Sequence, residues 1–136
     1  MESIKIDGRS LTIEQVAKVA REGTKIEITP DAKDRLKASR KLVFDLVDSN
    51  VPVYGFNTGV GWNKDKKVFK DFFQEYNKNL IYSHSLGVLP EASEAEVRAI
   101  MLARLNALLV GATGIQPEIA FMYADMLNYG IHPVIP

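Results

Sequence analysis

The sequence contains no cysteine among its 136 residues and only two histidines, His84 and His132. Without thiols there is no disulfide, no thiolate metal site and no cysteine nucleophile. Two histidines so far apart in the chain also disfavour a zinc site built from histidines and carboxylates. We therefore expect no metal, and the lack of cysteine fits a cytoplasmic protein.

Long apolar runs and an excess of one charge are missing as well. No stretch of about 18 consecutive apolar residues occurs, so the sequence predicts no membrane-spanning helix. The opening residues "MESIKIDGRS" lack the basic start and apolar run of a secretory signal. The 17 basic and 17 acidic residues cancel, whereas nucleic-acid binding depends on a basic patch. We expect a cytoplasmic protein with neither a membrane nor a nucleic acid as partner.

Helical periodicity dominates the residues that are present. Two capping-box pairs, Thr12 with Gln15 and Ser93 with Glu96, each open a helix. Wide apolar faces, which include Ile13 in the first helix, exceed what a small chain buries and suggest packing within a larger body. The sequence predicts a mainly α fold with a small β element near the N-terminus. The expected helices cover about 12–22, 30–48, 68–85, 93–110 and 117–129, and the expected strands cover 3–6 and 25–28.

A glycine segment, "VPVYGFNTGVGW" at 51–62, places three glycines within seven positions behind Tyr54. A tyrosine on a mobile glycine loop can be brought to a substrate as a general acid or base when the loop closes. The alternative is that Tyr54 ends a strand and only packs its ring. The loop by itself leaves both interpretations open.

His84 and Arg104 lie on predicted apolar stripes. His84 shares a helical face with Tyr76 and Leu80, so it is either a core histidine or a side chain that points into a shared pocket. Arg104 falls on the stripe of Met101, where a charge is costly unless it is paired. A structural ion pair within a helix bundle is the simpler interpretation of Arg104, and His132 receives no assignment.

Four segments in order resemble the N-terminal part of the aromatic amino acid lyase family, which comprises histidine, phenylalanine and tyrosine ammonia-lyases and related aminomutases. The resemblance covers essentially the whole chain and implies part of a fumarase/aspartase-like helical fold. Leu89, where a second glycine is common, and "ATG" at 112–114 depart from the family pattern. The matching segments are "YGFNTGVG" at 54–61, "NLIYSHSLGV" at 79–88, "VRAIMLARLNALLVGATG" at 97–114 and "LNYGIHPVIP" at 127–136.

This resemblance implies roles for the two candidate residues. Tyr54 corresponds to the essential catalytic tyrosine, an acid or base on a mobile lid loop of about 54–66. His84 corresponds to the histidine that lies by the substrate ring, and "SHSLG" favours histidine or tyrosine over phenylalanine as the substrate. Of these two substrates, the His-x-x-Gly spacing favours histidine. The remaining lid-loop residues are Gly55, Asn57, Thr58, Gly59 and Gly61.

The resemblance also implies a cofactor and partners. Family members use a methylidene-imidazolone (MIO) group made from an Ala-Ser-Gly segment, which does not occur here and which would follow Pro136. The expected whole protein is a homotetrameric histidine ammonia-lyase that converts L-histidine to urocanate and ammonia, without metal. Its partners would be the aromatic amino acid and the remainder of the lyase polypeptide, and residues 1–136 alone are expected to be inactive. The alternatives are a tyrosine ammonia-lyase or aminomutase, or a truncated non-catalytic homologue that assembles or regulates.

Overall fold

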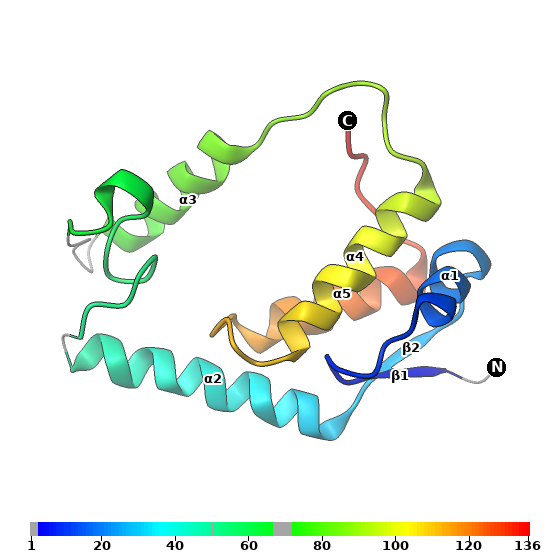
Figure 1. The fold of residues 1–136 in the computed structure, drawn as a ribbon, viewed down its shortest axis with the longest axis horizontal. Coiled ribbons are helices and arrows are strands. Elements are labelled where there is room, and N and C mark those ends of the chain that lie inside the picture. The colour runs from blue at the N-terminus through cyan, green and yellow to red at the C-terminus, as the bar shows by residue number, and fades with distance from the viewer. Residues whose placement is uncertain (1–2, 50, 67–71) are drawn as a thin grey trace. The chain divides into compact units, whose positions relative to one another are not determined.

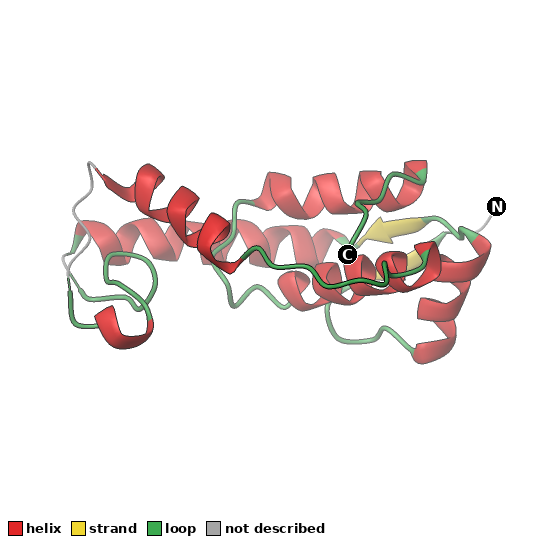
Figure 2. Cartoon of the chain, turned by 90° about the horizontal axis from the view of Figure 1, so that it is seen from above, coloured by secondary structure: helices red, strands yellow, loops and turns green. Residues whose placement is uncertain are grey.

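A computed structural model describes residues 3–49, 51–66 and 72–136 of the protein (Figure 1). The chain forms two compact units, a larger one of residues Met1–Lys41 and Val88–Pro136 and a smaller one of residues Leu42–Gly87. Helices dominate both, as Figure 2 shows, so the predicted mainly α fold is confirmed. The elements are β1 (Ile4–Ile6), α1 (Ile13–Glu22), β2 (Ile26–Ile28), α2 (Pro30–Asp48), the 3₁₀ turn η1 (Gly61–Asn63), α3 (Phe73–His84), α4 (Glu94–Leu109) and α5 (Pro117–Tyr129).

The predicted β element is a pair of parallel strands connected by α1. Ile4 of β1 lies opposite Ile26 of β2, and Ile6 lies opposite Ile28. On the other side of β2, the Asn128 amide of α5 accepts a hydrogen bond from the Ile26 N–H at 2.8 Å and donates one to its carbonyl at 3.0 Å. A side-chain amide thus satisfies the backbone groups that an additional strand would have bonded.

The two predicted capping boxes are confirmed. The Thr12 hydroxyl accepts from the Gln15 N–H and the Gln15 side chain accepts from the Thr12 N–H, and Ser93 and Glu96 repeat this exchange at α4. Gly23 ends α1 in the left-handed region, with φ of 68°. Each of these signals acts within a few residues of chain, which is why the sequence predicted these helix ends well.

The hydrophobic core of the larger unit is built around α4. This helix packs on α1 and on α5, and α5 packs in turn on β2. Three leucines of α4, at 102, 105 and 109, are completely buried. The other core members are Ile6, Val19, Ile26, Ile28, Ala32, Leu36, Val97, Met101, Ala120, Ala124 and Leu127.

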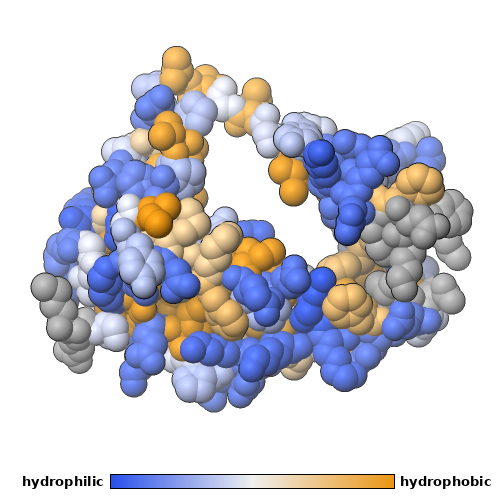
Figure 3. All heavy atoms as spheres, turned by 180° about the vertical axis from the view of Figure 1, so that it is seen from behind, coloured by the Kyte–Doolittle hydropathy of each residue, from blue (hydrophilic) through white to orange (hydrophobic). Residues whose placement is uncertain are grey.

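Several large apolar side chains are exposed, among them Ile13, which the sequence placed on an apolar helix face. Ile13 is 84% exposed because it begins α1, ahead of the buried turn of Val19 and Ala20. Leu42 is 57% exposed at the end of α2 that belongs to the smaller unit, and Phe72 is 58% exposed. Apolar side chains therefore remain on the surface, as the orange patches of Figure 3 show.

The buried arginine of α4 is Arg98, not Arg104. Arg104 is exposed, whereas Arg98 is only 4% exposed. At about 100° of rotation per residue, Arg98 falls inside the buried arc between Val97 and Leu102, and Arg104 falls just beyond its edge. The prediction that Arg104 is buried in an ion pair was therefore wrong.

Arg98 joins the C-terminal ends of two helices. Its Nη2 and Nε atoms donate to the Val19 carbonyl of α1 at 2.9 and 3.3 Å, and its Nη1 atom donates to the Leu127 carbonyl of α5 at 3.3 Å. The last carbonyls of a helix lack intrahelical partners and attract positive charge. One guanidinium group therefore caps α1 and α5 and ties both helices to α4.

The smaller unit contains the end of α2, the glycine segment, η1 and α3. In the described part of this unit, Thr58 and Gly59 are buried. The apolar side chains described there are all half-buried or exposed. The predicted start of the third helix near residue 68, and Phe69 on its stripe, lie outside the described residues. Within 3–49, 51–66 and 72–136, no helix is both long and apolar enough to cross a bilayer.

Candidate functional site

Tyr54 and His84 line the same pocket of the smaller unit. The pocket has a volume of about 710 Å³. Tyr54 of the glycine segment and Asn63, which directly follows that segment, belong to one wall of the pocket. The other wall comes from α3. The two residues that the sequence singled out separately, 30 positions apart in the numbering, are thus brought together. The α3 wall consists of Tyr76, Asn79, Leu80, Ser83 and His84.

The Tyr54 side chain is held by the backbone of its own loop. Its hydroxyl oxygen accepts a hydrogen bond from the Gly61 N–H at 3.0 Å, while the side chain remains 64% exposed. An exposed side chain whose hydroxyl oxygen has a fixed direction can reach a bound molecule. Gly61 has φ of 57°, a left-handed conformation that glycine adopts without strain.

Asn57 and Thr58 organise the glycine segment from within. The Asn57 amide accepts from the Val53 N–H at 2.7 Å and donates to the Val51 carbonyl at 2.9 Å. The buried Thr58 hydroxyl accepts from the Gly55 N–H at 3.3 Å and donates to the Gly59 carbonyl at 3.0 Å. Both side chains bond backbone groups of the segment, so their contacts here shape the loop rather than line the pocket.

The other two glycines of the segment are required by local geometry. Gly55 has φ of 73°. At Gly59, an added Cβ would lie 2.8 Å from the Cβ of Asn63, closer than two such atoms can approach. The structure thus gives each of these two lid-loop glycines a particular conformational or steric role.

His84 ends α3 with an exposed imidazole ring. Its Nδ1 atom lies 2.8 Å from the Leu80 carbonyl oxygen and 3.0 Å from the Ser83 hydroxyl oxygen. The expected common face with Tyr76 and Leu80 is present, since all three residues line the pocket. Because the ring is exposed, His84 is not a core histidine of the described chain.

Two further α3 residues of the pocket were missed from the sequence. Asn79 and Ser83 lie on the same helical face as Tyr76, at positions i+3 and i+7, and both line the pocket. That periodicity was the signal that could have found them. The pocket therefore offers two phenols, an imidazole, two side-chain amides and a serine hydroxyl around the apolar side chain of Leu80, which suits a small ring compound with polar groups.

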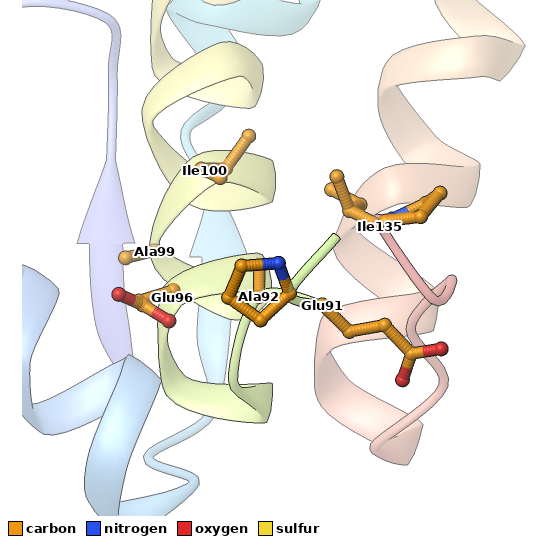
Figure 4. A pocket seen from close by; sticks show the side chains of 8 residues that line it. Glu91, Ala92, Glu96, Ala99, Ile100 and Ile135 are labelled. Carbon is orange, nitrogen blue, oxygen red and sulfur yellow. The ribbon is translucent and has the colours of Figure 1, made fainter. Parts of the chain in front are cut away.

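A second pocket, of about 600 Å³, lies at the start of α4 in the larger unit (Figure 4). Glu91 and Glu96 supply its carboxylates, which point in opposite directions. The Glu96 carboxylate accepts from the Ser93 hydroxyl at 2.6 Å and the Ser93 N–H at 2.7 Å, and these bonds lower its pKa. Glu96 is thus engaged in capping, and this pocket is the weaker candidate.

Neither pocket has the donors of a metal centre. Within the described ranges, no three histidine or carboxylate side chains gather closely enough to hold an ion. His132, which received no assignment from the sequence, places its Nε2 atom 3.5 Å from a Glu94 carboxylate oxygen in the larger unit. Of these two pockets, the one lined by Tyr54 and His84 is the stronger candidate for chemistry on a small molecule.

Comparison with known proteins gives consistent relatives. The family model for aromatic amino acid lyases matches residues 11–136. A histidine ammonia-lyase from Treponema denticola is 43% identical over 133 residues, which cover 98% of this chain and 26% of that protein. The chain thus spans about a quarter of the length of this curated relative.

Two solved structures match nearly the whole chain. The ergothioneine-degrading enzyme ergothionase from Treponema denticola has a TM-score of 0.94 and 48% identity, covering 99% of this chain and 27% of that one. A tyrosine aminomutase from Streptomyces globisporus has a TM-score of 0.93 and 37% identity, covering 99% of this chain and 26% of that one. The fold is therefore shared with enzymes whose names carry different substrates and reactions.

Proposed function

Because the chain belongs to the aromatic amino acid lyase family, we propose that it is the N-terminal part of a lyase that converts L-histidine to urocanate and ammonia. The pocket shared by Tyr54 and His84 carries this proposal. A histidine ammonia-lyase 43% identical over 98% of the chain supports histidine as the substrate. The whole protein is proposed to be a cytoplasmic homotetramer.

Tyr54 is assigned the proton transfer. Forming urocanate from histidine breaks a C–H bond at Cβ and the C–N bond at Cα, so a group must accept a proton at Cβ. The Tyr54 hydroxyl is exposed at the pocket, and the Gly61 N–H fixes the direction of its oxygen. We assign His84 the role of contacting the substrate ring, because its imidazole lines the same pocket from α3. The lid loop of about 54–66 would exclude water from this pocket when it closes.

The MIO group, when present, supplies the electrophile for the substrate amine. Its Ala-Ser-Gly precursor does not occur in these 136 residues, so the remainder of the lyase polypeptide would provide it. The pocket suits such an arrangement, because Tyr54 is exposed there beside a volume of about 710 Å³. We propose that residues 1–136 alone release no ammonia.

A second candidate function is the degradation of ergothioneine, which is favoured by the 48% identity to ergothionase over 99% of the chain. A tyrosine ammonia-lyase or aminomutase is a further candidate, since the tyrosine aminomutase is 37% identical. The candidate that is not an enzyme is a homologue without catalytic activity that has only an assembly or regulatory role.

The test uses the complete protein that contains this chain, purified and incubated separately with L-histidine, L-tyrosine and ergothioneine. Urocanate and ammonia are expected from L-histidine, and neither is expected from the 136-residue chain alone. Coumarate or β-tyrosine from L-tyrosine, without turnover of histidine, would overturn the substrate assignment. No turnover of any of the three would favour the non-catalytic homologue.

A further inference from the structure

A third pocket, of about 290 Å³, lies in the larger unit, where the C-terminal ends of α1 and α5 meet α4. It shares no residue with either pocket described above. Three of its lining side chains are positive, those of Arg21, Lys25 and Arg98, and one is negative, that of Glu94. A pocket of this size takes a small molecule, and its charge favours an anion.

Arg98 supplies a buried positive charge to this pocket. It is only 4% exposed, and no ion pair joins it to a carboxylate of the described residues. A guanidinium group carries five N–H groups, and three of those of Arg98 donate to the Val19 and Leu127 carbonyls. The other two have no acceptor within 3–49, 51–66 and 72–136. Because an unpaired buried donor is costly, Arg98 favours a pocket occupant that accepts hydrogen bonds.

Arg21 and Lys25 add two exposed cations to the same pocket. Arg21 lies in the last turn of α1, and Lys25 directly precedes β2. Neither forms an ion pair with a carboxylate in the part of the chain that the structure describes. The Glu94 carboxylate lies 3.5 Å from Nε2 of His132, a residue that does not line the pocket. The lining side chains therefore keep an excess of positive charge.

We propose that this pocket binds a small phosphate-bearing anion, either free phosphate or a compact phosphate monoester. A phosphate group carries nearly two negative charges at neutral pH and has three strong acceptor oxygens. These properties match the positive excess of the pocket and the two available N–H groups of Arg98. The planar guanidinium fork suits phosphate oxygens, and a lysine beside it acts as a point charge.

The bound anion would join the same three helices that Arg98 already connects. Arg21 belongs to α1 and Arg98 to α4, and the end of α5 lines the same pocket. Phosphate would therefore stabilise the packing of the larger unit, since a ligand that binds only the folded chain shifts the equilibrium toward it. This inference uses no residue of the pocket that carries the proposed function, and it does not depend on the substrate.

The first experiment titrates inorganic phosphate into the complete protein by isothermal titration calorimetry. Chloride keeps the ionic strength constant, because salt screens exposed charges. Saturable binding of one phosphate per chain is expected. The double variant Arg21→Glu with Lys25→Glu should raise Kd by at least about tenfold, because two cations of the pocket become anions.

A second double variant, Arg9→Glu with Lys37→Glu, is the matched control. Both residues are exposed in the larger unit and do not line the pocket. The change in net charge is the same, so Kd should change by less than about twofold if binding depends on the pocket. Equal weakening in the two double variants, or no saturable binding to the complete protein, would overturn the proposal.

Two further anions define the ligand class. Succinate is a dianion without a phosphate group, and it should bind at least about tenfold more weakly than phosphate. Succinate binding as tight as that of phosphate would overturn the assignment to phosphate. Glycerol 3-phosphate distinguishes the two sources of the group: tighter binding than inorganic phosphate indicates a phosphate monoester, and weaker binding indicates the free ion.

The second experiment locates the anion directly. In crystals of the complete protein soaked in phosphate, a phosphate oxygen is expected within about 3.2 Å of a guanidinium nitrogen of Arg98. Phosphate bound only elsewhere would overturn the proposal. Neither experiment measures turnover, so a protein that binds phosphate here but does not convert histidine would support this inference and reject the proposed function.

Discussion

The hydroxyl oxygen of Tyr54 lies 3.0 Å from the backbone nitrogen of Gly61 and accepts its hydrogen bond. The eight residues from Tyr54 to Gly61 thus close into a loop. The bond fixes the direction of the hydroxyl oxygen although the side chain is 64% exposed. Fixed orientation of a proton-transfer group toward a substrate is worth a large part of a catalytic barrier. The two residues therefore form one functional unit, and each can be tested.

Tyr54→Phe in the complete protein should lower kcat by at least about 100-fold, since general acid–base groups contribute on this scale. Only a hydroxyl on an exposed side chain is lost, so the circular dichroism spectrum should not change. Tyr82→Phe is the matched control, because Tyr82 is a 67% exposed tyrosine of α3 that does not line the pocket. Near-normal turnover of Tyr54→Phe would assign Tyr54 to packing only.

Gly61→Ala should lower kcat more than it changes KM. The new methyl group would meet nothing within 4 Å, but φ of 57° strains any residue with a Cβ, at a cost of about 1–2 kcal/mol. Relief of that strain would turn the N–H away from the Tyr54 oxygen. Steady-state kinetics of the complete protein measures the effect.

Gly23→Ala is the control for this strain. Gly23 has φ of 68° and also has nothing within 4 Å of an added Cβ, but it ends α1 in the larger unit. It should cost similar stability, measured by urea unfolding, and leave kcat unchanged. Equal loss of kcat in the two variants would mean that Gly61 acts through stability and not through Tyr54.

Local signals in the sequence predicted the fold more successfully than long-range ones. Thr12 and Gln15 act across three residues, so their spacing alone determined the start of α1. Arg98 and Arg104 lie about 120° apart around α4, and only the packing of α1 and α5 determines which of them is buried. Helical periodicity identifies the apolar face of a helix but not exactly where that face ends, and Arg104 lies at its edge.

The candidate site shows the same limit. A hydrogen bond from a backbone N–H to a side chain seven residues earlier, as between Gly61 and Tyr54, leaves no mark in composition or periodicity. The attachment of His84 to the Leu80 carbonyl depends on a side-chain rotamer, which the sequence does not specify. Family resemblance pointed to Tyr54 and His84, but it did not indicate what holds either side chain.

Arg98→Ala should lower the free energy of unfolding by about 3 kcal/mol, because two helix ends lose a charged hydrogen-bond donor at a buried position. Arg104→Ala is the matched control on the same helix. Arg104 is exposed, so its loss should change stability by less than about 0.5 kcal/mol. Urea unfolding of the two variants compares them directly, and equal stabilities would show that Arg98 contributes no more than a surface charge.

Asp7 gives the protein a predictable sensitivity to acid. Its Oδ1 atom accepts hydrogen bonds from the Arg9 N–H and the Ser10 N–H at 2.8 Å each, and from the Ser10 hydroxyl at 2.9 Å. These bonds, with that from the Arg9 N–H the largest contribution, lower the pKa of Asp7 from 3.8 to about 2. The unfolded chain therefore binds this proton at higher pH than the folded one.

The contribution of Asp7 to stability should be present above about pH 4 and should disappear as the pH falls toward about 2. Asp7→Asn has no carboxylate to protonate at this position, so its free energy of unfolding should fall less steeply across that interval. Ser10→Ala, which removes only the hydroxyl donor, should lie between the two. Urea unfolding at a series of pH values measures these slopes. The free energy of unfolding of Asp7→Asn could instead fall with pH as steeply as that of the original protein. That result would mean that the hydrogen bonds of the Asp7 carboxylate persist in the unfolded chain or that other carboxylates dominate the acid response.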